Sequence, residues 1–167
     1  MKKLLDELIQ KFGEGSRISI DSAPQLSLGV SSTVCALAQL KQEGKDYITG
    51  LLCPIRPDDY GLKGARISYT EARQITSTFN LPDIPVHCFI SAFDKRLKIG
   101  VEVMRSLLQD DLLADHVSPV MVRYSSEISK ANMNKESIFS GKITNATADY
   151  QDLVLYLLGY EGQVGQA

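Results

Sequence analysis

Residues 56–66 contain the densest set of side chains able to bind a ligand. They include two arginines, a lysine, two aspartates and a tyrosine, namely Arg56, Asp58, Asp59, Tyr60, Lys63 and Arg66. Guanidinium groups form paired hydrogen bonds with phosphates and carboxylates, and a following helix would add the positive potential of its N-terminus. We therefore interpret this segment as a loop offering a site for an anionic small molecule. The alternative is a solvated loop whose charges pair with one another.

Thiols and imidazoles are scarce in this chain. It has three cysteines and two histidines, namely Cys35, Cys53, Cys88, His87 and His116. His87 and Cys88 are adjacent on an expected strand, so their side chains point to opposite faces and cannot form a catalytic dyad. Cys88 shares its face with apolar neighbours, which raise a thiol pKa and make the thiol inert. We interpret all three cysteines as packed, reduced thiols of a cytosolic protein.

A metal site has weak support from the spacing of possible ligands. The densest cluster of oxygen and nitrogen ligands is formed by Asp110, Asp111, Asp115 and His116. If a helix continued there, Asp111 and Asp115 would share a face and could hold a divalent ion, whereas the alternative is a solvated surface with one capping aspartate. Neither a nucleophile elbow nor a phosphate-binding glycine loop is present. We expect no metal and no cofactor, and we favour a non-catalytic role while leaving enzymatic activity open.

Length and composition predict one ordinary globular domain. The chain has 167 residues, of which 44% are hydrophobic and 23% charged, and its net charge is −2. We expect a single domain over residues 1–160 and a flexible tail over 161–167. A near-neutral chain lacks the basic surplus of nucleic-acid binders. No apolar run is long enough to cross a membrane, and Asp6 and Glu7 interrupt the only stretch that begins like a signal peptide.

The first half of the chain should begin with a helix. Apolar residues from Leu4 to Phe12 fall on one helical face, and Gly13 should end that helix. Residues 17–21 alternate like a short strand. Residues 33–55 fit either a helix over 33–41 or a strand hairpin, and the glycine-containing turn between two apolar runs favours the hairpin.

The second half predicts further hairpins separated by helices. Ser68 and Glu71 form a capping box that should open a helix. We expect strands at 86–93 and 97–103, helical spacing from Met104 to Leu112, further strands at 120–124 and 138–143, a mobile hairpin tip at 125–136, and a last helix at 150–158. These elements predict an α+β fold, a mainly antiparallel sheet built from hairpins with about four helices packed mostly on one face. We expect no alternation of strand and helix of the doubly wound kind.

The shortage of activated side chains favours recognition over catalysis. We predict a non-catalytic cytosolic protein-binding domain, an adaptor or chaperone-like assembly factor that binds another protein or a second copy of itself. The amphipathic first helix should dock on the chain's own sheet or in a partner's groove. The expected order of elements is similar to that of small secretion chaperones, which implies the same kind of role. The alternative is a small enzyme or ligand-binding domain that uses residues 56–66 to bind an anion.

Overall fold

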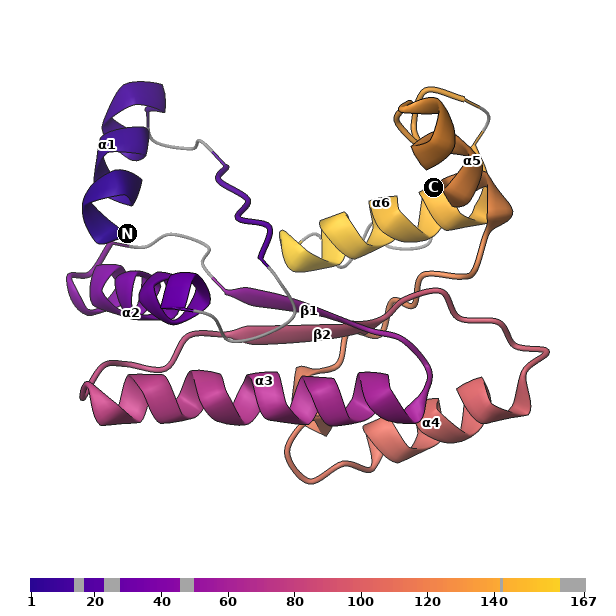
Figure 1. Ribbon diagram of the computed structural model, residues 1–167, viewed down its shortest axis with the longest axis horizontal. Coiled ribbons are helices and arrows are strands. Elements are labelled where there is room, and N and C mark those ends of the chain that lie inside the picture. Colours follow the sequence, from indigo (N-terminus) through magenta and orange to yellow (C-terminus); the bar gives the residue numbers. More distant parts are fainter. Residues whose placement is uncertain (14–16, 23–27, 46–49, 142, 160–167) are drawn as a thin grey trace. The chain divides into compact units, whose positions relative to one another are not determined.

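The computed structural model describes residues 1–13, 17–22, 28–45, 50–141 and 143–159. The structure is mostly helical and contains a short parallel pair of strands; Figure 1 labels these elements. The elements in chain order are α1 (Lys2–Phe12), α2 (Leu28–Gln42), β1 (Leu51–Ile55), α3 (Asp59–Thr78), β2 (Val86–Ile90), α4 (Lys98–Leu108), the 3₁₀ turn η1 (Ala114–His116), α5 (Ser126–Asn134) and α6 (Asn145–Leu157).

The chain divides into two compact units. Unit 1 comprises Met1–Leu51 and Ile67–Val86, and unit 2 comprises Leu52–Arg66 and His87–Ala167. The prediction of a single domain over 1–160 stays a prediction, and the tail over 161–167 lies outside the described residues. Within the part of the chain that the structure describes, no helix has the length and apolar character required to span a membrane.

Unit 1 is built on α2, whose small and apolar side chains are buried along most of its length. Leu40 and Ala36 pack with Leu5 of α1, and the same helix contributes Val34 and Ala38 to a second cluster with Ile84. The predicted first helix is confirmed as α1, and its end is confirmed at Gly13, whose φ of 88° is readily adopted only by glycine.

The strands of the sheet are parallel neighbours joined by α3. Leu51 N donates to Pro85 O at 2.9 Å, and Ser91 N donates to Ile55 O at 2.9 Å. This pattern places Leu51 opposite Val86 and Ile55 opposite Ile90. The order β1–α3–β2 is the alternation of strand and helix that the sequence was not expected to contain, and it replaces the predicted hairpins.

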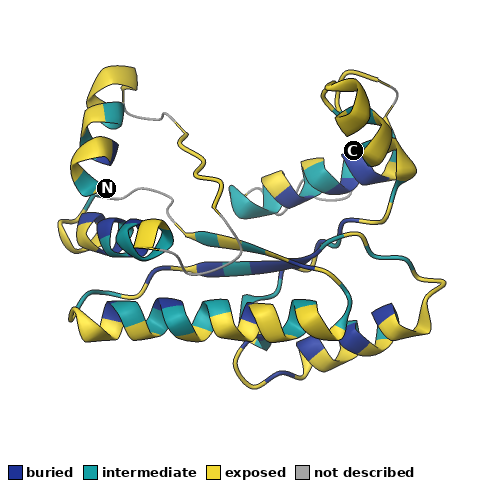
Figure 2. Ribbon diagram, in the orientation of Figure 1, coloured by how far each residue is buried: buried dark blue, intermediate teal, exposed yellow. Residues whose placement is uncertain are grey.

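A third extended segment in unit 2, residues 117–124, runs parallel to β2. Bridges join Cys88 to Val117 and Phe93 to Arg123, and Val122 N donates to Ile90 O at 2.8 Å. Beside this segment, α6 packs its Leu153 against Phe89. Figure 2 shows the result: β2 is mostly buried, whereas residues of β1 alternate between exposed and more buried positions.

The expected antiparallel sheet is wrong, because two predicted hairpins are helical. Residues 33–41, for which a strand was favoured, lie in α2. This helix is buried on several sides, so its apolar residues do not mark one stripe, and periodicity could not separate it from a strand. Residues 97–103, where apolar and polar residues alternate, lie mainly in α4. There Gly100, Val103 and Leu107 are buried at helical spacing, while the apolar side chain of Ile99 is 52% exposed.

The remaining strand predictions are correct only in part. The strand at 86–93 is confirmed as β2 over Val86–Ile90, and 120–124 is extended, whereas 17–21 and the described residues of 138–143 contain no strand. The predicted hairpin tip at 125–136 contains α5, which Ser125 caps by accepting a hydrogen bond from the Glu127 backbone. The element order that resembled secretion chaperones is therefore also wrong. The last helix is confirmed as α6, although it begins earlier, at Asn145.

Candidate functional site

The predicted loop at 56–66 is instead the end of β1 followed by the first turns of α3. Asp58 directly precedes the helix and accepts a hydrogen bond from Gly61 N at 2.7 Å, as an N-capping residue does. Arg56 Nε lies 3.8 Å from the Asp58 carboxylate. Asp59 adds a second carboxylate in the first helical turn. The positive end of the helix is thus already matched by two negative charges, which weakens its attraction for an external anion.

The backbone makes a close turn between the strand and the helix. A Cβ atom on Gly61 would lie 2.1 Å from Arg56 O, a distance that real side chains do not reach. Only glycine therefore allows the helix to begin this close to the strand end. Because the connection is this tight, the loop within residues 56–66 is limited to Arg56–Asp58, and the rest of this charged stretch is helical.

The structure does not gather the six predicted site residues into one cluster. Tyr60 is 86% exposed and Lys63 is also exposed. Arg66 lies two turns along the helix, where its guanidinium is 3.2 Å from Asp110 and 2.9 Å from Asp111. Of the predicted set, Arg56 and Asp58 are paired with each other, and Arg66 is paired elsewhere. The interpretation of residues 56–66 as an anion site stays a prediction.

The aspartate cluster that was considered for a metal organises a turn. The buried Asp110 carboxylate accepts hydrogen bonds from Leu112 N at 3.0 Å and Leu113 N at 3.1 Å, while Asp111 is 83% exposed. Asp110 thus caps the turns that follow α4. Among the residues that the structure describes, no three His, Cys, Asp or Glu side chains are grouped closely enough to hold a metal ion.

His87 and Cys88 occupy different environments, as their neighbouring positions on β2 predict. Cys88 is fully buried, and its pKa is raised by a hydrogen bond with Cys53 and by burial. His87 is half-buried, and its pKa is lowered by burial and by the nearby charge of His116. The bridge between Cys88 and Val117 brings the preceding residues, His87 and His116, side by side. This proximity explains why the charge of His116 affects the pKa of His87.

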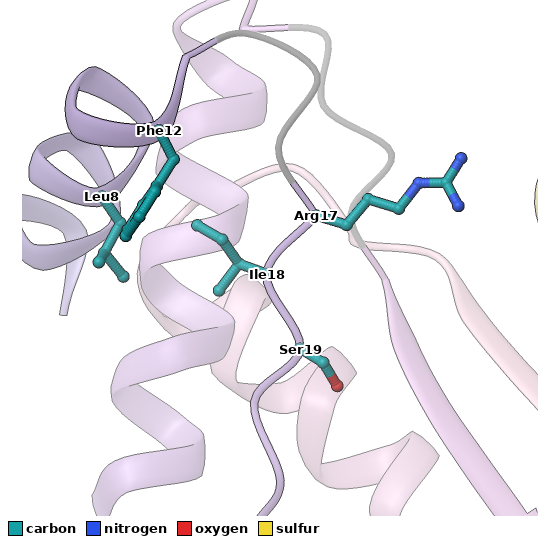
Figure 3. A pocket seen from close by; sticks show the side chains of 5 residues that line it. All are labelled: Leu8, Phe12, Arg17, Ile18 and Ser19. Carbon is teal, nitrogen blue, oxygen red and sulfur yellow. The ribbon is translucent and has the colours of Figure 1, made fainter. Parts of the chain in front are cut away.

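An open groove of about 500 Å³ lies in unit 1, between α1 and the extended residues that follow it. Among the described residues, its lining includes Leu8, Phe12, Arg17, Ile18 and Ser19. Figure 3 shows Ile18 pointing toward Leu8 and Phe12, whereas the Arg17 side chain extends away from these apolar groups. Phe12 and Ile18 are 62% and 39% exposed. The groove therefore presents apolar surface to solvent from two separate stretches of the chain.

The helix that forms one wall of this groove is held to α2 by residues of its first two turns. Leu5 is buried against α2, and Lys45 Nζ lies 2.6 Å from the Asp6 carboxylate. A second ion pair joins Lys2 to Glu43. Of the two predicted docking modes of the first helix, packing within its own chain is observed, and it takes place on α2 rather than on a sheet. These contacts lie in the first half of the helix, whereas Phe12, on the same face as Leu5 but at the last position, is exposed in the groove.

The sequence does not predict this groove, because residues 17–21 alternate like a strand. Two signals were nevertheless present: an aromatic residue at the last position of α1, and isoleucine soon after the helix-ending Gly13. An apolar residue that follows a helix end often packs back on the helix.

No protein-family model and no curated protein sequence matches this chain.

Proposed function

We propose that this chain is a non-catalytic protein-binding domain, an adaptor or assembly factor, that holds an apolar segment of another protein in the groove between α1 and residues 17–19. The observation that carries the proposal is the convergence of Leu8, Phe12 and Ile18 on an open hollow. Exposed apolar side chains that gather from separate segments mark interaction surfaces more often than apolar side chains exposed singly.

The size and chemistry of the groove favour a peptide segment over a substrate. Its volume of about 500 Å³ accommodates one or two large side chains. Its side chains supply apolar surface, one guanidinium from Arg17 and one hydroxyl from Ser19. This combination supports binding by burial of apolar surface, with polar groups that fix orientation. The described part of its lining contains no histidine or carboxylate of the kind that general acid–base catalysis uses.

Basic side chains border the apolar surface and indicate the charge of the partner. Lys11 Nζ lies 5.3 Å from the centre of the Phe12 ring, and Arg17 extends from the opposite wall. An apolar segment flanked by aspartate or glutamate would place its carboxylates near these cations. We therefore propose a partner segment with one or two large apolar residues and an acidic neighbour.

The proposed location is the cytosol. All three cysteines, Cys35, Cys53 and Cys88, are free thiols. Free thiols are stable in a reducing compartment and are at risk of unplanned oxidation outside the cell. A cytosolic adaptor is consistent with this state.

Selection of peptides from a random displayed library tests the proposal directly. The full chain should enrich peptides that combine large apolar residues with an acidic neighbour. Their affinities are then measured by calorimetry with synthetic peptides. Phe12→Asp should weaken binding by ~10-fold or more, because it places a charge in the apolar groove. Arg17→Glu should weaken acidic peptides more than neutral ones.

Phe79→Asp provides a matched control. Phe79 belongs to the same unit, is 64% exposed and does not line the groove, so its substitution should leave peptide affinity unchanged. The proposal fails if no peptide is enriched, or if the enriched peptides bind the Phe12→Asp and Phe79→Asp variants equally well. A dimer that dissociates on Phe12→Asp substitution, with no peptide enriched, would instead identify a second copy of the chain as the occupant and contradict a separate partner.

A further inference from the structure

The parallel register of the strands places two cysteines directly opposite each other. Because Leu51 lies opposite Val86 and Ile55 opposite Ile90, Cys53 of β1 lies opposite Cys88 of β2. Opposed residues in neighbouring strands project to the same face of the sheet. Their backbones are ~4.8 Å apart, which lies within the range that a disulfide bridges.

The two thiols differ in their access to solvent. Cys88 has an exposed fraction of 0%, whereas Cys53 is only partly buried. Cys53 is therefore the residue of the pair that a small solute can approach from outside. In a pair of this kind, the more accessible sulfur reacts first with an oxidant, and the buried sulfur then attacks the oxidised sulfur to form a disulfide.

The two neighbouring thiols shift each other's pKa in opposite directions. The contact with Cys88 lowers the pKa of Cys53, although burial opposes this change, and the same contact raises the pKa of Cys88. Both directions are expected when the Cys88 thiol donates its proton toward the Cys53 sulfur. Cys53 is thus the sulfur favoured as thiolate, the form that reacts with oxidants.

We propose that Cys53 and Cys88 form a reversible modification site for hydrogen peroxide. The Cys53 thiolate attacks one peroxide oxygen, the O–O bond breaks, and the second oxygen leaves as hydroxide and is protonated to water. The resulting Cys53 sulfenic acid is attacked by the Cys88 sulfur, which forms the S–S bond and expels the sulfenic oxygen as a second water. Overall, two thiols are oxidised to one disulfide, and one hydrogen peroxide is reduced to two waters. This inference goes beyond the proposed partner binding and does not depend on it.

Strand geometry makes the resulting disulfide labile. Side chains that project in parallel from neighbouring strands keep roughly the strand spacing of ~4.8 Å between their Cβ atoms. A relaxed disulfide prefers a Cβ separation of ~3.8 Å, so the strands must approach each other slightly. Strained disulfides are reduced more readily than relaxed ones, so cellular thiols should restore the pair. Disulfides of this transient type are the ones expected in the cytosol.

Oxidation of the full chain with hydrogen peroxide, followed by mass spectrometry without reductant, tests the proposal. The expected product is a peptide pair linking Cys53 to Cys88 that dithiothreitol separates. Cys35 is the internal control, because it is also partly exposed but lies in α2, away from this pair in the sequence. Cys53 should be modified ~10-fold faster than Cys35 or more.

Two variants separate the steps of the reaction. In Cys88→Ser, the Cys53 sulfenic acid should accumulate and be trapped by dimedone. In Cys53→Ser, Cys88 should stay reduced, because its sulfur is buried. Equal rates at Cys35 and Cys53 in the unmodified chain would overturn the proposal. So would lasting sulfenic or sulfinic acid at Cys53 without the linked peptides, and both of these results are independent of whether either variant folds.

Discussion

Arg123 binds Asp149 through both of its carboxylate oxygens. Arg123 Nη2 lies 2.6 Å from Oδ1, Nε lies 2.8 Å from Oδ2, and the Arg123 backbone N–H donates to Oδ2 at 2.9 Å. The Asp149 side chain is 11% exposed, whereas that of Arg123 is 50% exposed. The Asp149 carboxylate thus accepts hydrogen bonds from both the guanidinium and the backbone N–H of Arg123, and these bonds link the extended residues 117–124 to α6.

Replacing Asp149 should therefore destabilise unit 2. Asp149→Ala leaves a backbone N–H and a guanidinium without their acceptor, and we expect a loss of about 2 kcal/mol in the free energy of unfolding. Urea denaturation measures this loss. Gln151→Ala, at an exposed position of the same helix, should change stability by less than about 0.5 kcal/mol. Equal stability of the two variants would contradict the role given to Asp149.

Two glycines of α3 should respond to alanine in opposite directions. A Cβ on Gly61 would meet Arg56 O at 2.1 Å, so Gly61→Ala should cost about 2 kcal/mol as the strand–helix connection shifts. Gly64 has nothing within 4 Å of its Cβ position, so Gly64→Ala should gain about 0.5–1 kcal/mol from helix propensity. Thermal unfolding of both variants measures the contrast. A stabilising Gly61→Ala would show that the helix does not start as described.

The sequence was most informative where one side of an element is exposed. The stripe from Leu4 to Phe12 predicted α1 because only one of its sides packs on the chain. In α2 the buried residues include Thr33, Val34, Ala36 and Ala38, which do not define one stripe. Neither the helical period of 3.6 residues nor the strand period of two therefore dominates the pattern. The parallel pairing of β1 and β2 was also beyond prediction, since it depends on contacts between residues that are distant in the sequence.

The candidate site residues could be named from their types but not from their partners. Arg56, Asp58 and Arg66 were recognised as charged groups near a helix start. Their actual roles follow from capping at Asp58 and from pairing of Arg66 with Asp110, which lies far along the chain. The opposition of Cys53 and Cys88 has the same origin, because it requires knowledge of the strand register.

Asp110 should matter for stability far more than its neighbour Asp111. Asp110 is buried, accepts two backbone hydrogen bonds and lies 3.2 Å from Arg66, so Asp110→Ala should cost about 1–2 kcal/mol. Asp111 is 83% exposed and forms a surface ion pair, so Asp111→Ala should cost less than about 0.5 kcal/mol. Chemical denaturation of the two variants provides the comparison. Similar losses would indicate that charge, rather than capping, stabilises the turn.

His87 should make the folded chain less stable in mild acid. Burial and the nearby charge of His116 lower the pKa of His87 in the folded state. Between that lowered pKa and the unfolded value of ~6.5, the unfolded chain binds more protons, so stability rises with pH in this window and falls on acidification. The contribution is fully present above the unfolded pKa and is lost as the pH falls toward the folded one.

Substitution of each histidine separates the two causes of this shift. Nuclear magnetic resonance titration of the imidazoles should show the pKa of His87 moving upward in His116→Gln, because the charge repulsion is removed while the burial remains. In His87→Gln, the fall in the free energy of unfolding from pH ~7 to pH ~5, measured with urea, should be smaller than in the unmodified chain. An identical pH dependence in His87→Gln would show that other groups govern acid stability, and an unchanged titration in His116→Gln would show that burial alone lowers the pKa of His87.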